Sequence, residues 1–227
     1  AEARGPMGLE KREHIRQLCQ LPTIADRWRE RHGAEPAQSD VDRLYEALLP
    51  LQMAAIRDCA QLIPGCREMV TALRARGIRI GANTGYSRAM LEPLLQAAAE
   101  QGYAPDSTVC ATEVPRGRPY PDMSFKNLLE LGADTVHACV KVDDTVPGIE
   151  EGLNAGLWTV GVAISGNEIG LPLAGWEALP VPEQRRRRER AYRRLLTGGA
   201  HYVIDSIVDL PRCLDAIEAR LARGERP

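Results

Sequence analysis

Polar residues follow three apolar segments of this sequence, in a pattern suited to binding a phosphoryl group. Thr84 and Gly85 come after IRIGAN, and Arg116 and Arg118 lie in the loop PRGRPYP that follows STVCATEV. A threonine hydroxyl and bare backbone amides can donate hydrogen bonds to phosphoryl oxygens, and an arginine on a stiff loop can offer a fixed cation. Taken singly, each feature also fits an ordinary turn or a surface loop.

The third polar strand end carries two adjacent carboxylates. Asp143, Asp144 and Thr145 follow the apolar run HACVKV. Neighbouring carboxylates repel each other unless a cation or hydrogen-bond donors compensate, and Mg²⁺ prefers one or two carboxylates together with water and substrate oxygens. The alternative is structural, with one aspartate capping the helix that begins near Pro147. We favour the metal site.

An alternation of strands and helices can bring these residues together. From Pro64 onward, amphipathic helical segments alternate with short apolar ones, which predicts an α/β fold with a parallel sheet covered on both faces. In such sheets ligands gather at the carboxyl ends of the strands. The expected strands lie in IRIGANTG, STVCATEV, HACVKVDD, LWTVGVAI and HYVIDS.

The first sixty residues have a different pattern. Residues 11–31 have apolar positions near helical spacing with a break at Pro22, and Ser39 and Asp40 can cap a second helix that Pro50 kinks or divides. We therefore predict two units, a helical one over residues 1–60 and an α/β one over residues 61–227. The arginine-rich stretch EQRRRRERAYRRLL could be a nucleic-acid patch, but its apolar spacing favours a solvated helix.

Composition restricts the class of protein. The chain has 227 residues, 44% hydrophobic and 26% charged, with a formal net charge of -2, values typical of a globular protein rather than a general nucleic-acid binder. No apolar run approaches the ~20 residues that cross a bilayer, and the first residues are too charged for a signal peptide. Six scattered cysteines without zinc-ligand spacing predict reduced thiols in a cytoplasmic protein.

In chain order, the threonine-glycine turn, the basic loop and the paired aspartates match motifs of the haloacid dehalogenase (HAD) superfamily. Within it the sequence most resembles the phosphonoacetaldehyde hydrolases. The stretches that carry this resemblance are PMGLEKREHIRQL, GIRIGANTGYSRAML, VPRGRPYPDM and VKVDDTVPGIEEGLNAGLWTVGV followed by GNEIGL. They span nearly the whole chain in family order. The resemblance implies a HAD-type Rossmann-like core with an α-helical cap over residues 1–60.

The resemblance also implies roles for residues of the cap. Lys11 would form a Schiff base with the substrate aldehyde, because a protonated imine accepts the electron pair of a breaking carbon–phosphorus bond far better than an aldehyde does. We expect burial and nearby cations to lower the pKa of this lysine. His14, three positions further along the helix, would transfer or position protons, and Met7 would pack at the same site.

For the core, the resemblance implies a phosphoryl-binding set and a metal ion. Thr84, Gly85 and Arg118 would bind the phosphoryl group, Tyr86 would line the pocket, and Asp144 would be the principal ligand of Mg²⁺, with Asp143 as a second. It further implies a small phosphonate as substrate and a homodimer formed through the caps, without nucleic-acid or membrane partners.

Two features depart from the superfamily pattern. HAD enzymes often carry another aspartate four residues after the first of the last motif, and that position, counted from Asp144, is Gly148. The superfamily's first motif is an apolar strand ending in Asp-x-x-x-Thr, and neither the residues before Lys11 nor any later aspartate provides it. We therefore expect this chain to start inside the cap, to lack the first core strand and to be inactive alone.

The function predicted for the parent protein is hydrolysis of phosphonoacetaldehyde to acetaldehyde and phosphate, through a lysine Schiff base and an aspartyl phosphate. Two alternatives remain open. One is a HAD phosphatase acting on phosphate esters, which needs no lysine in the cap. The other is a non-catalytic HAD-like remnant.

Overall fold

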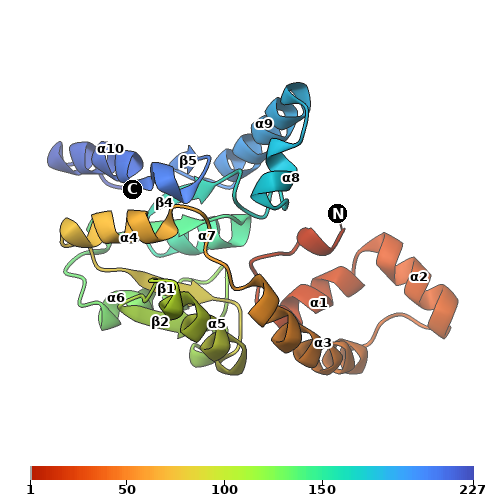
Figure 1. Ribbon diagram of the computed structural model, residues 1–227. Coiled ribbons are helices and arrows are strands. Elements are labelled where there is room, and N and C mark those ends of the chain that lie inside the picture. The colour runs from red at the N-terminus through yellow and green to blue at the C-terminus, as the bar shows by residue number, and fades with distance from the viewer. Residues whose placement is uncertain (1) are drawn as a thin grey trace.

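The computed structural model describes residues 2–227 and places helices first (Figure 1). A short 3-10 helix, η1 (Glu2–Arg4), precedes α1 (Lys11–Cys19), α2 (Pro22–His32) and α3 (Gln38–Cys59). The break expected at Pro22 is confirmed, with proline at the start of α2. By contrast α3 continues through Pro50 rather than dividing there.

The expected cap of α3 differs in detail. The helix begins one residue before Ser39, with Ala37 at the N-cap, so Ser39 and Asp40 lie in the first turn. The Asp40 carboxylate accepts a hydrogen bond from the backbone N–H of Ala37 (2.9 Å). It therefore satisfies the helix start from inside the first turn, as the acidic partner of a capping box does.

The rest of the chain has the expected alternation of helices and strands. The proposed division at residue 60 falls between α3 and α4. The strands are β1 (Gly81–Thr84), β2 (Ser107–Cys110), β3 (Val140–Asp143), β4 (Trp158–Val162) and β5 (Tyr202–Ile204). The helices are α4 (Cys66–Ala75), α5 (Arg88–Glu100), α6 (Asp122–Glu130), α7 (Val146–Asn154), α8 (Leu173–Glu177), α9 (Val181–Thr197) and α10 (Leu210–Ala222), with 3-10 turns η2 (Ala111–Glu113), η3 (Val136–Ala138) and η4 (Ile207–Asp209).

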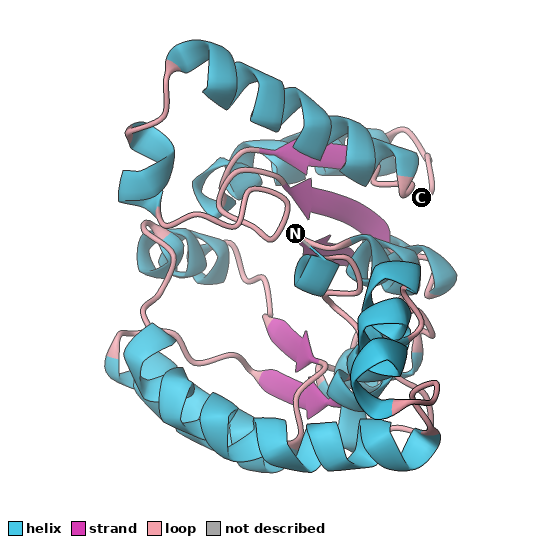
Figure 2. Cartoon of the chain, turned by 90° about the vertical axis from the view of Figure 1, so that its right-hand side faces the viewer, coloured by secondary structure: helices cyan, strands magenta, loops and turns pink. Residues whose placement is uncertain are grey.

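All strand pairing in the described residues is parallel, but it forms two sheets instead of one. β1 pairs with β2, and β4 lies between β3 and β5. Figure 2 shows the two groups of strands apart, with helices around them. β1 and β3 are both edge strands. Thr84 and Asp143 are their last residues, and Gly85 and Asp144 follow directly.

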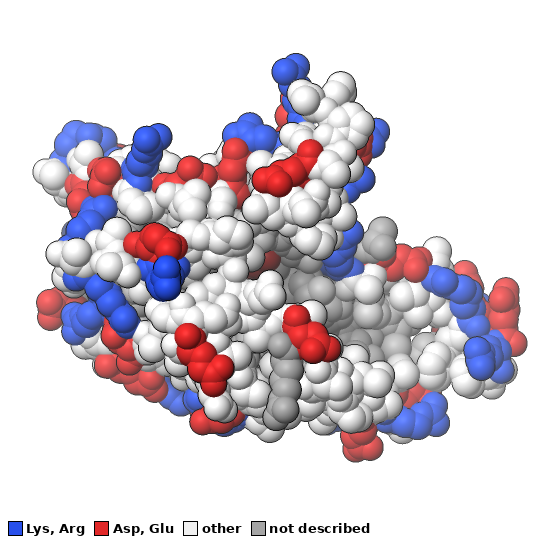
Figure 3. All heavy atoms as spheres, in the orientation of Figure 1, with Lys and Arg blue, Asp and Glu red and all other residues white. Residues whose placement is uncertain are grey.

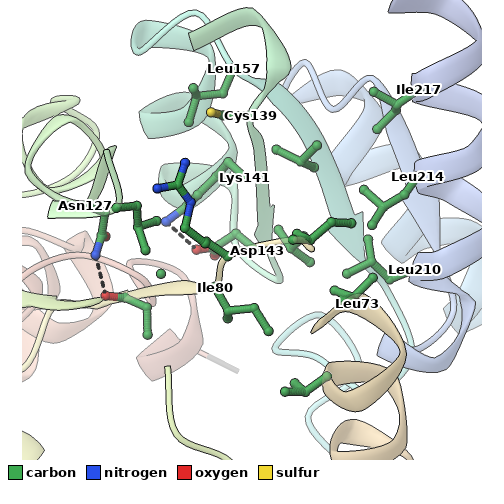
Figure 4. A pocket seen from close by; sticks show the side chains of 18 of the residues that line it. Leu73, Ile80, Asn127, Cys139, Lys141, Asp143, Leu157, Leu210, Leu214 and Ile217 are labelled. Carbon is green, nitrogen blue, oxygen red and sulfur yellow. Dashed lines mark hydrogen bonds and ion pairs between the residues drawn. The ribbon is translucent and has the colours of Figure 1, made fainter. Parts of the chain in front are cut away.

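A cavity of about 890 Å³ lies between these two edge strands. Residues of β1 and β3 line it together with apolar side chains of α4, α6 and α10, including Leu73, Leu128 and Leu214 (Figure 4). The main apolar core continues from its walls and is built on β4, α4 and α10 around Trp158, which is fully buried. The cavity is therefore bounded by sheet edges on two sides.

The arginine-rich stretch is a helix, α9, as predicted. Its buried residues, Ala191 and Leu195, pack against the core, while several arginines pair with carboxylates, for example Arg187 with Glu183 and Arg188 with Asp205. In the face drawn in Figure 3, acidic and basic side chains are interspersed over the outer helices. None of the described helices combines the length and apolar character needed to cross a membrane.

Candidate active site

The turn after β1 carries Thr84 and Gly85 and lies against the N-terminal segment. The Thr84 hydroxyl accepts a hydrogen bond from the backbone N–H of Tyr86 (3.2 Å), which fixes the turn. A Cβ added to Gly85 would stand 2.6 Å from the carbonyl oxygen of Leu9. Glycine is required here because the backbone of the N-terminal segment approaches so closely.

The same N-terminal segment contacts two other elements of the α/β unit. Gly8 has φ +100°, and a Cβ there would lie 2.3 Å from the Thr145 hydroxyl. The Gly8 carbonyl accepts a hydrogen bond from Nη1 of Arg118 (3.2 Å). Residues 8–10 thus lie over the carboxyl ends of both edge strands, and they place the start of α1 beside the core residues predicted to bind phosphate.

Lys11, at the start of α1, is half-buried in this junction. Its Nζ lies 4.0 Å from Sδ of Met7 and 5.3 Å from the centre of the Tyr86 ring. Burial lowers the pKa of Lys11, Glu10 opposes the shift, and the positive charge of Arg118 adds to it. The expected direction and both expected causes are confirmed, so the neutral, nucleophilic amine is more accessible than in an exposed lysine.

His14 is buried on the next turn of α1. Its Nε2 lies 2.9 Å from the carbonyl oxygen of Ala3, and its Nδ1 is buried without a hydrogen-bond partner among the described residues. Burial lowers the pKa of His14, the bond to Ala3 opposes this, and Lys11 lowers it further. A neutral imidazole close to Lys11 can take up or release a proton.

Arg118 is only 9% exposed and is held within the protein on several sides. Its Nε donates to Glu151 (2.8 Å), and Nη2 donates to the side-chain and backbone oxygens of Asn83 (2.7 and 3.2 Å). The carboxylate of Asp143 lies 3.3 Å from Nη2. By contrast Arg116, the other arginine of the loop, is exposed and pairs with Asp122.

Asp143 occupies the space that a side chain at position 148 would need. A Cβ added to Gly148 would stand 2.0 Å from Cγ of Asp143. The Asp143 carboxylate also accepts from the backbone N–H and hydroxyl of Thr145 (3.0 and 2.7 Å). Burial would raise the pKa of Asp143, but Arg118 and Lys141 outweigh it and hold the pKa below its ordinary value.

Asp144 has a different environment. Burial and the adjacent Asp143 raise the pKa of Asp144, and the backbone N–H of Asn167 donates a hydrogen bond to it (2.8 Å). Among the side chains that the structure describes, no lysine or arginine forms an ion pair with this carboxylate, and no cluster of three or more acidic, histidine or cysteine ligands is found. Asp144 is thus the carboxylate of this site without an ion-pair partner among those side chains.

The sequence interpretation missed Lys141 and Glu151, two buried charged residues at the core of the site. Lys141 Nζ lies 2.9 Å from Glu151, 2.5 Å from Oδ1 of Asn83 and 3.6 Å from Asp143 (Figure 4 shows Lys141 and Asp143). A lysine inside the apolar run HACVKV was the available signal, because it shares a strand face with the residue two positions later, Asp143.

Comparison with known proteins shows the family to which the chain belongs. Residues 3–156 match the family model described as haloacid dehalogenase-like hydrolase. The whole chain is 55% identical to a phosphonoacetaldehyde hydrolase of Hahella chejuensis, covering 77% of that protein, and 49% identical to one of Salmonella agona, covering 85%. A crystal structure of a phosphonoacetaldehyde hydrolase-like protein from Oleispira antarctica matches with a TM-score of 0.97 at 52% identity, covering all of this chain and 82% of that one.

Proposed function

Because the chain belongs to the haloacid dehalogenase-like hydrolases, and among them to the phosphonoacetaldehyde hydrolase family, we propose that it cleaves the carbon–phosphorus bond of phosphonoacetaldehyde. The products are acetaldehyde and phosphate. The predicted HAD-type α/β fold and the predicted hydrolase class are those of its relatives.

The proposal is supported above all by the position of the Lys11 amine, which lies close to the residues proposed to bind the phosphoryl group. Lys11 is half-buried beside Tyr86, close enough to Arg118 for that cation to lower its pKa, and the segment before it lies on the Thr84–Gly85 turn. An aldehyde carbon bound at Lys11 has its phosphonate directed toward this turn. An ordinary phosphate-ester phosphatase has no use for such an amine.

The reaction then follows from the chemistry of the imine. The neutral amine of Lys11 attacks the aldehyde carbon and water leaves, which gives a protonated imine. A carboxylate attacks phosphorus, and the electron pair of the carbon–phosphorus bond moves onto carbon to form an enamine. Protonation and hydrolysis release acetaldehyde and free Lys11, and water hydrolyses the acyl phosphate to phosphate. His14 is the nearby group for proton transfer, while Met7 and Tyr86 enclose the carbon end.

Asp144 would hold Mg²⁺, with Asp143 beside it and the remaining positions taken by water and phosphoryl oxygens. The fit rests on the donor set, because Asp143 and Asp144 are adjacent carboxylates at the end of β3 and Asp144 has no ion-pair partner among the described side chains. A bound cation would also offset the burial and the repulsion from Asp143 that raise the pKa of Asp144. When bound, the ion stabilises negative charge on the transferring phosphoryl group. Asp143 is already neutralised by Arg118 and Lys141, which makes it the weaker candidate ligand.

The attacking carboxylate requires a further strand. Asp143 ends β3, Asp144 follows it and Asp205 follows β5, but none of these three begins the Asp-x-x-x-Thr sequence of the first HAD motif. The cavity between β1 and β3 suits such a strand, because it has a sheet edge on each side and apolar walls. A strand pairing with both edges would bring its C-terminal aspartate to the Thr84 turn and Asp144.

Product analysis tests this function on protein that carries such a strand. We expect equal amounts of acetaldehyde and phosphate from phosphonoacetaldehyde. Lys11→Arg should abolish both because arginine cannot form the imine, whereas Lys126→Arg, on α6, should leave the rate unchanged. Phosphate release from simple phosphate esters at a rate equal to the phosphonate, and insensitive to Lys11→Arg, would favour the phosphatase alternative.

The unit over residues 1–60 is proposed to be the cap and the site of homodimer formation. Leu51 on α3 is 68% exposed, and the proposal places it in the dimer contact. Sedimentation of the wild type against Leu51→Glu tests this, since a buried charge would dissociate a dimer formed there.

A further inference from the structure

Glu151, on α7, is a fully buried carboxylate with four hydrogen-bond donors. Its Oε2 accepts from Arg118 Nε (2.8 Å) and Lys141 Nζ (2.9 Å), and its Oε1 accepts from Asn83 Nδ2 (2.8 Å) and Ser124 Oγ (2.8 Å). The side chain is 0% exposed. A buried carboxylate with this many donors is fixed in orientation.

The four donors come from four separate parts of the core. Asn83 is the residue before Thr84 in β1, Arg118 lies on the basic loop, Lys141 is in β3 and Ser124 is in α6. Glu151 itself comes from the helix that follows the paired aspartates. One carboxylate therefore connects all three segments whose polar residues gather at the strand ends.

A close contact of α7 with the sheet allows Glu151 to reach this position. A Cβ added to Gly152 would lie 2.7 Å from Cβ of Lys141 and 2.7 Å from Cγ2 of Thr159. The helix therefore packs directly on β3 and β4, and the preceding residue, Glu151, reaches Lys141 of β3 and Asn83 of β1. Gly152 thus permits the close packing of α7 that brings Glu151 to its donors.

Arg118 has little freedom in this arrangement. Of the five N–H donors of a guanidinium, one is used by Glu151, two by Asn83 and one by the Gly8 carbonyl. At most one remains for another ligand. The orientation of that N–H depends on the acceptor at Nε, which is Glu151.

We propose that Glu151 is a positioning residue that holds Arg118, Lys141 and Asn83 in place for a phosphoryl group at the Thr84 turn. This inference rests on the proposed function, because it assigns the phosphoryl end of the substrate to these residues. Stability alone does not account for the network, since apolar side chains of similar volume can replace a buried ion pair at little cost.

Whether removal of the Glu151 charge raises or lowers phosphate affinity distinguishes a purely electrostatic role from a positioning role. Removing a negative charge near a phosphate site without moving its donors should strengthen phosphate binding, because a repulsion is lost. Losing the orientation of Arg118 and Asn83 should weaken it, by on the order of tenfold or more for a hydrogen bond between charged groups. Glu151→Gln keeps the size of the side chain and removes the charge.

The test compares Glu151→Gln with Glu150→Gln, the neighbouring half-buried glutamate. Two measurements are made on the full chain: the Arg118 Nε–H signal in ¹H–¹⁵N spectra, identified by its loss in Arg118→Lys, and the binding of inorganic phosphate by calorimetry. We expect Glu151→Gln to lose the signal and to bind phosphate about tenfold more weakly or worse, while Glu150→Gln keeps both. When Arg118 is already replaced by lysine, Glu151→Gln should weaken phosphate binding by only about twofold or less, because the guanidinium that Glu151 positions is absent.

If Glu151→Gln does not fold, Glu151→Asp replaces it with the same expectation, because aspartate keeps the charge but has a shorter reach toward Arg118. Phosphate binding that is unchanged or tighter in the folded variant would overturn the proposal. A wild type that keeps the Arg118 signal but binds no phosphate would instead contradict the phosphoryl site itself, and so the proposed function.

Discussion

At the residue scale, the chemistry of Lys11 depends on its burial. A lysine in water is protonated at neutral pH and is a poor nucleophile. Burial lowers the pKa of Lys11 and the neighbouring Arg118 adds to the shift, whereas Glu10 works against it. The neutral form of Lys11 that the proposed imine needs is therefore favoured, and the folded state holds the charged form at an energetic cost.

This cost gives a prediction about stability. The unfolded chain binds the Lys11 proton more tightly than the folded protein does, so the charge destabilises the fold below the lowered pKa, and the penalty disappears as pH rises toward the ordinary value of 10.5. Lys11→Met should raise the urea midpoint at pH 7, by an amount that decreases as pH rises toward 10.5. A gain that is constant over this range would contradict the burial of a charged amine.

The Asp143 carboxylate leaves no room for a side chain at Gly148. A Cβ at position 148 would collide with the Asp143 carboxylate at 2.0 Å. We expect Gly148→Ala to destabilise the protein by roughly 1–3 kcal/mol, as overpacking does. Gly175→Ala, where a Cβ meets only ordinary contacts, is the control.

The double variant Asp143→Ala/Gly148→Ala then completes a cycle measured by urea unfolding. Because removing the carboxylate makes room for the new methyl group, its destabilisation should be less than the sum of the two single effects. Strict additivity would mean that the two residues do not compete for the same space.

At the scale of elements, α7 connects the strand end to the site. Thr145 is its N-cap: the hydroxyl accepts from the backbone N–H of Gly148 (3.2 Å) and donates to Asp143 (2.7 Å). Thr145→Ala should cost about 1 kcal/mol or more of unfolding free energy, because both interactions are lost. Thr145→Ser keeps the hydroxyl and should retain most of the stability; equal losses in the two variants would show that the cap contributes nothing.

Most elements could be predicted from the sequence because their apolar spacing is regular, but their ends could not. The strand expected over STVCATEV ends at Cys110, where Glu113 accepts from the Cys110 backbone N–H and turns the chain into a 3-10 helix. Similarly, HACVKVDD gives a strand only from Val140. Local hydrogen bonds of single side chains decide these ends, and periodicity does not contain them.

The site was predictable to the extent that its residues follow strands. Thr84 and Asp143 could be found because each stands where a strand ends, and Arg118 because it lies in the basic loop after the second strand. Lys11 and His14 entered through family resemblance alone. Glu151 lies in the middle of a helix and looks like an exposed glutamate in sequence. Its role depends on the packing of α7 onto β3, which no local pattern contains.

At the scale of the whole molecule, the division of the parallel strands into two sheets is the main feature. The edges of β1 and β3 face a cavity of about 890 Å³ that ends at the site. Unpaired strand edges accept another strand readily, because its backbone supplies the missing hydrogen bonds. The expectation that the first core strand occupies this position therefore remains a prediction that can be tested directly.

Residues 1–227 alone should bind the aldehyde but release no phosphate, because the attacking carboxylate is not among the described residues. Supplying an apolar strand that ends in Asp-x-x-x-Thr should raise the melting temperature and permit turnover. The same peptide with asparagine in place of its aspartate should raise the melting temperature only. Full hydrolase activity of residues 1–227 without an added strand would refute the claim that the strand supplies the attacking carboxylate.

The central claim, imine formation at Lys11, is tested most directly by reductive trapping. The chain contains only three lysines, Lys11, Lys126 and Lys141, so an adduct can be assigned without ambiguity. After incubation with phosphonoacetaldehyde and borohydride, intact mass and peptide mapping should show a single adduct on Lys11, absent from Lys11→Arg. An adduct on Lys126 or the terminal amine alone, or none at all with folded protein, would contradict the assignment of carbon–phosphorus cleavage to this site.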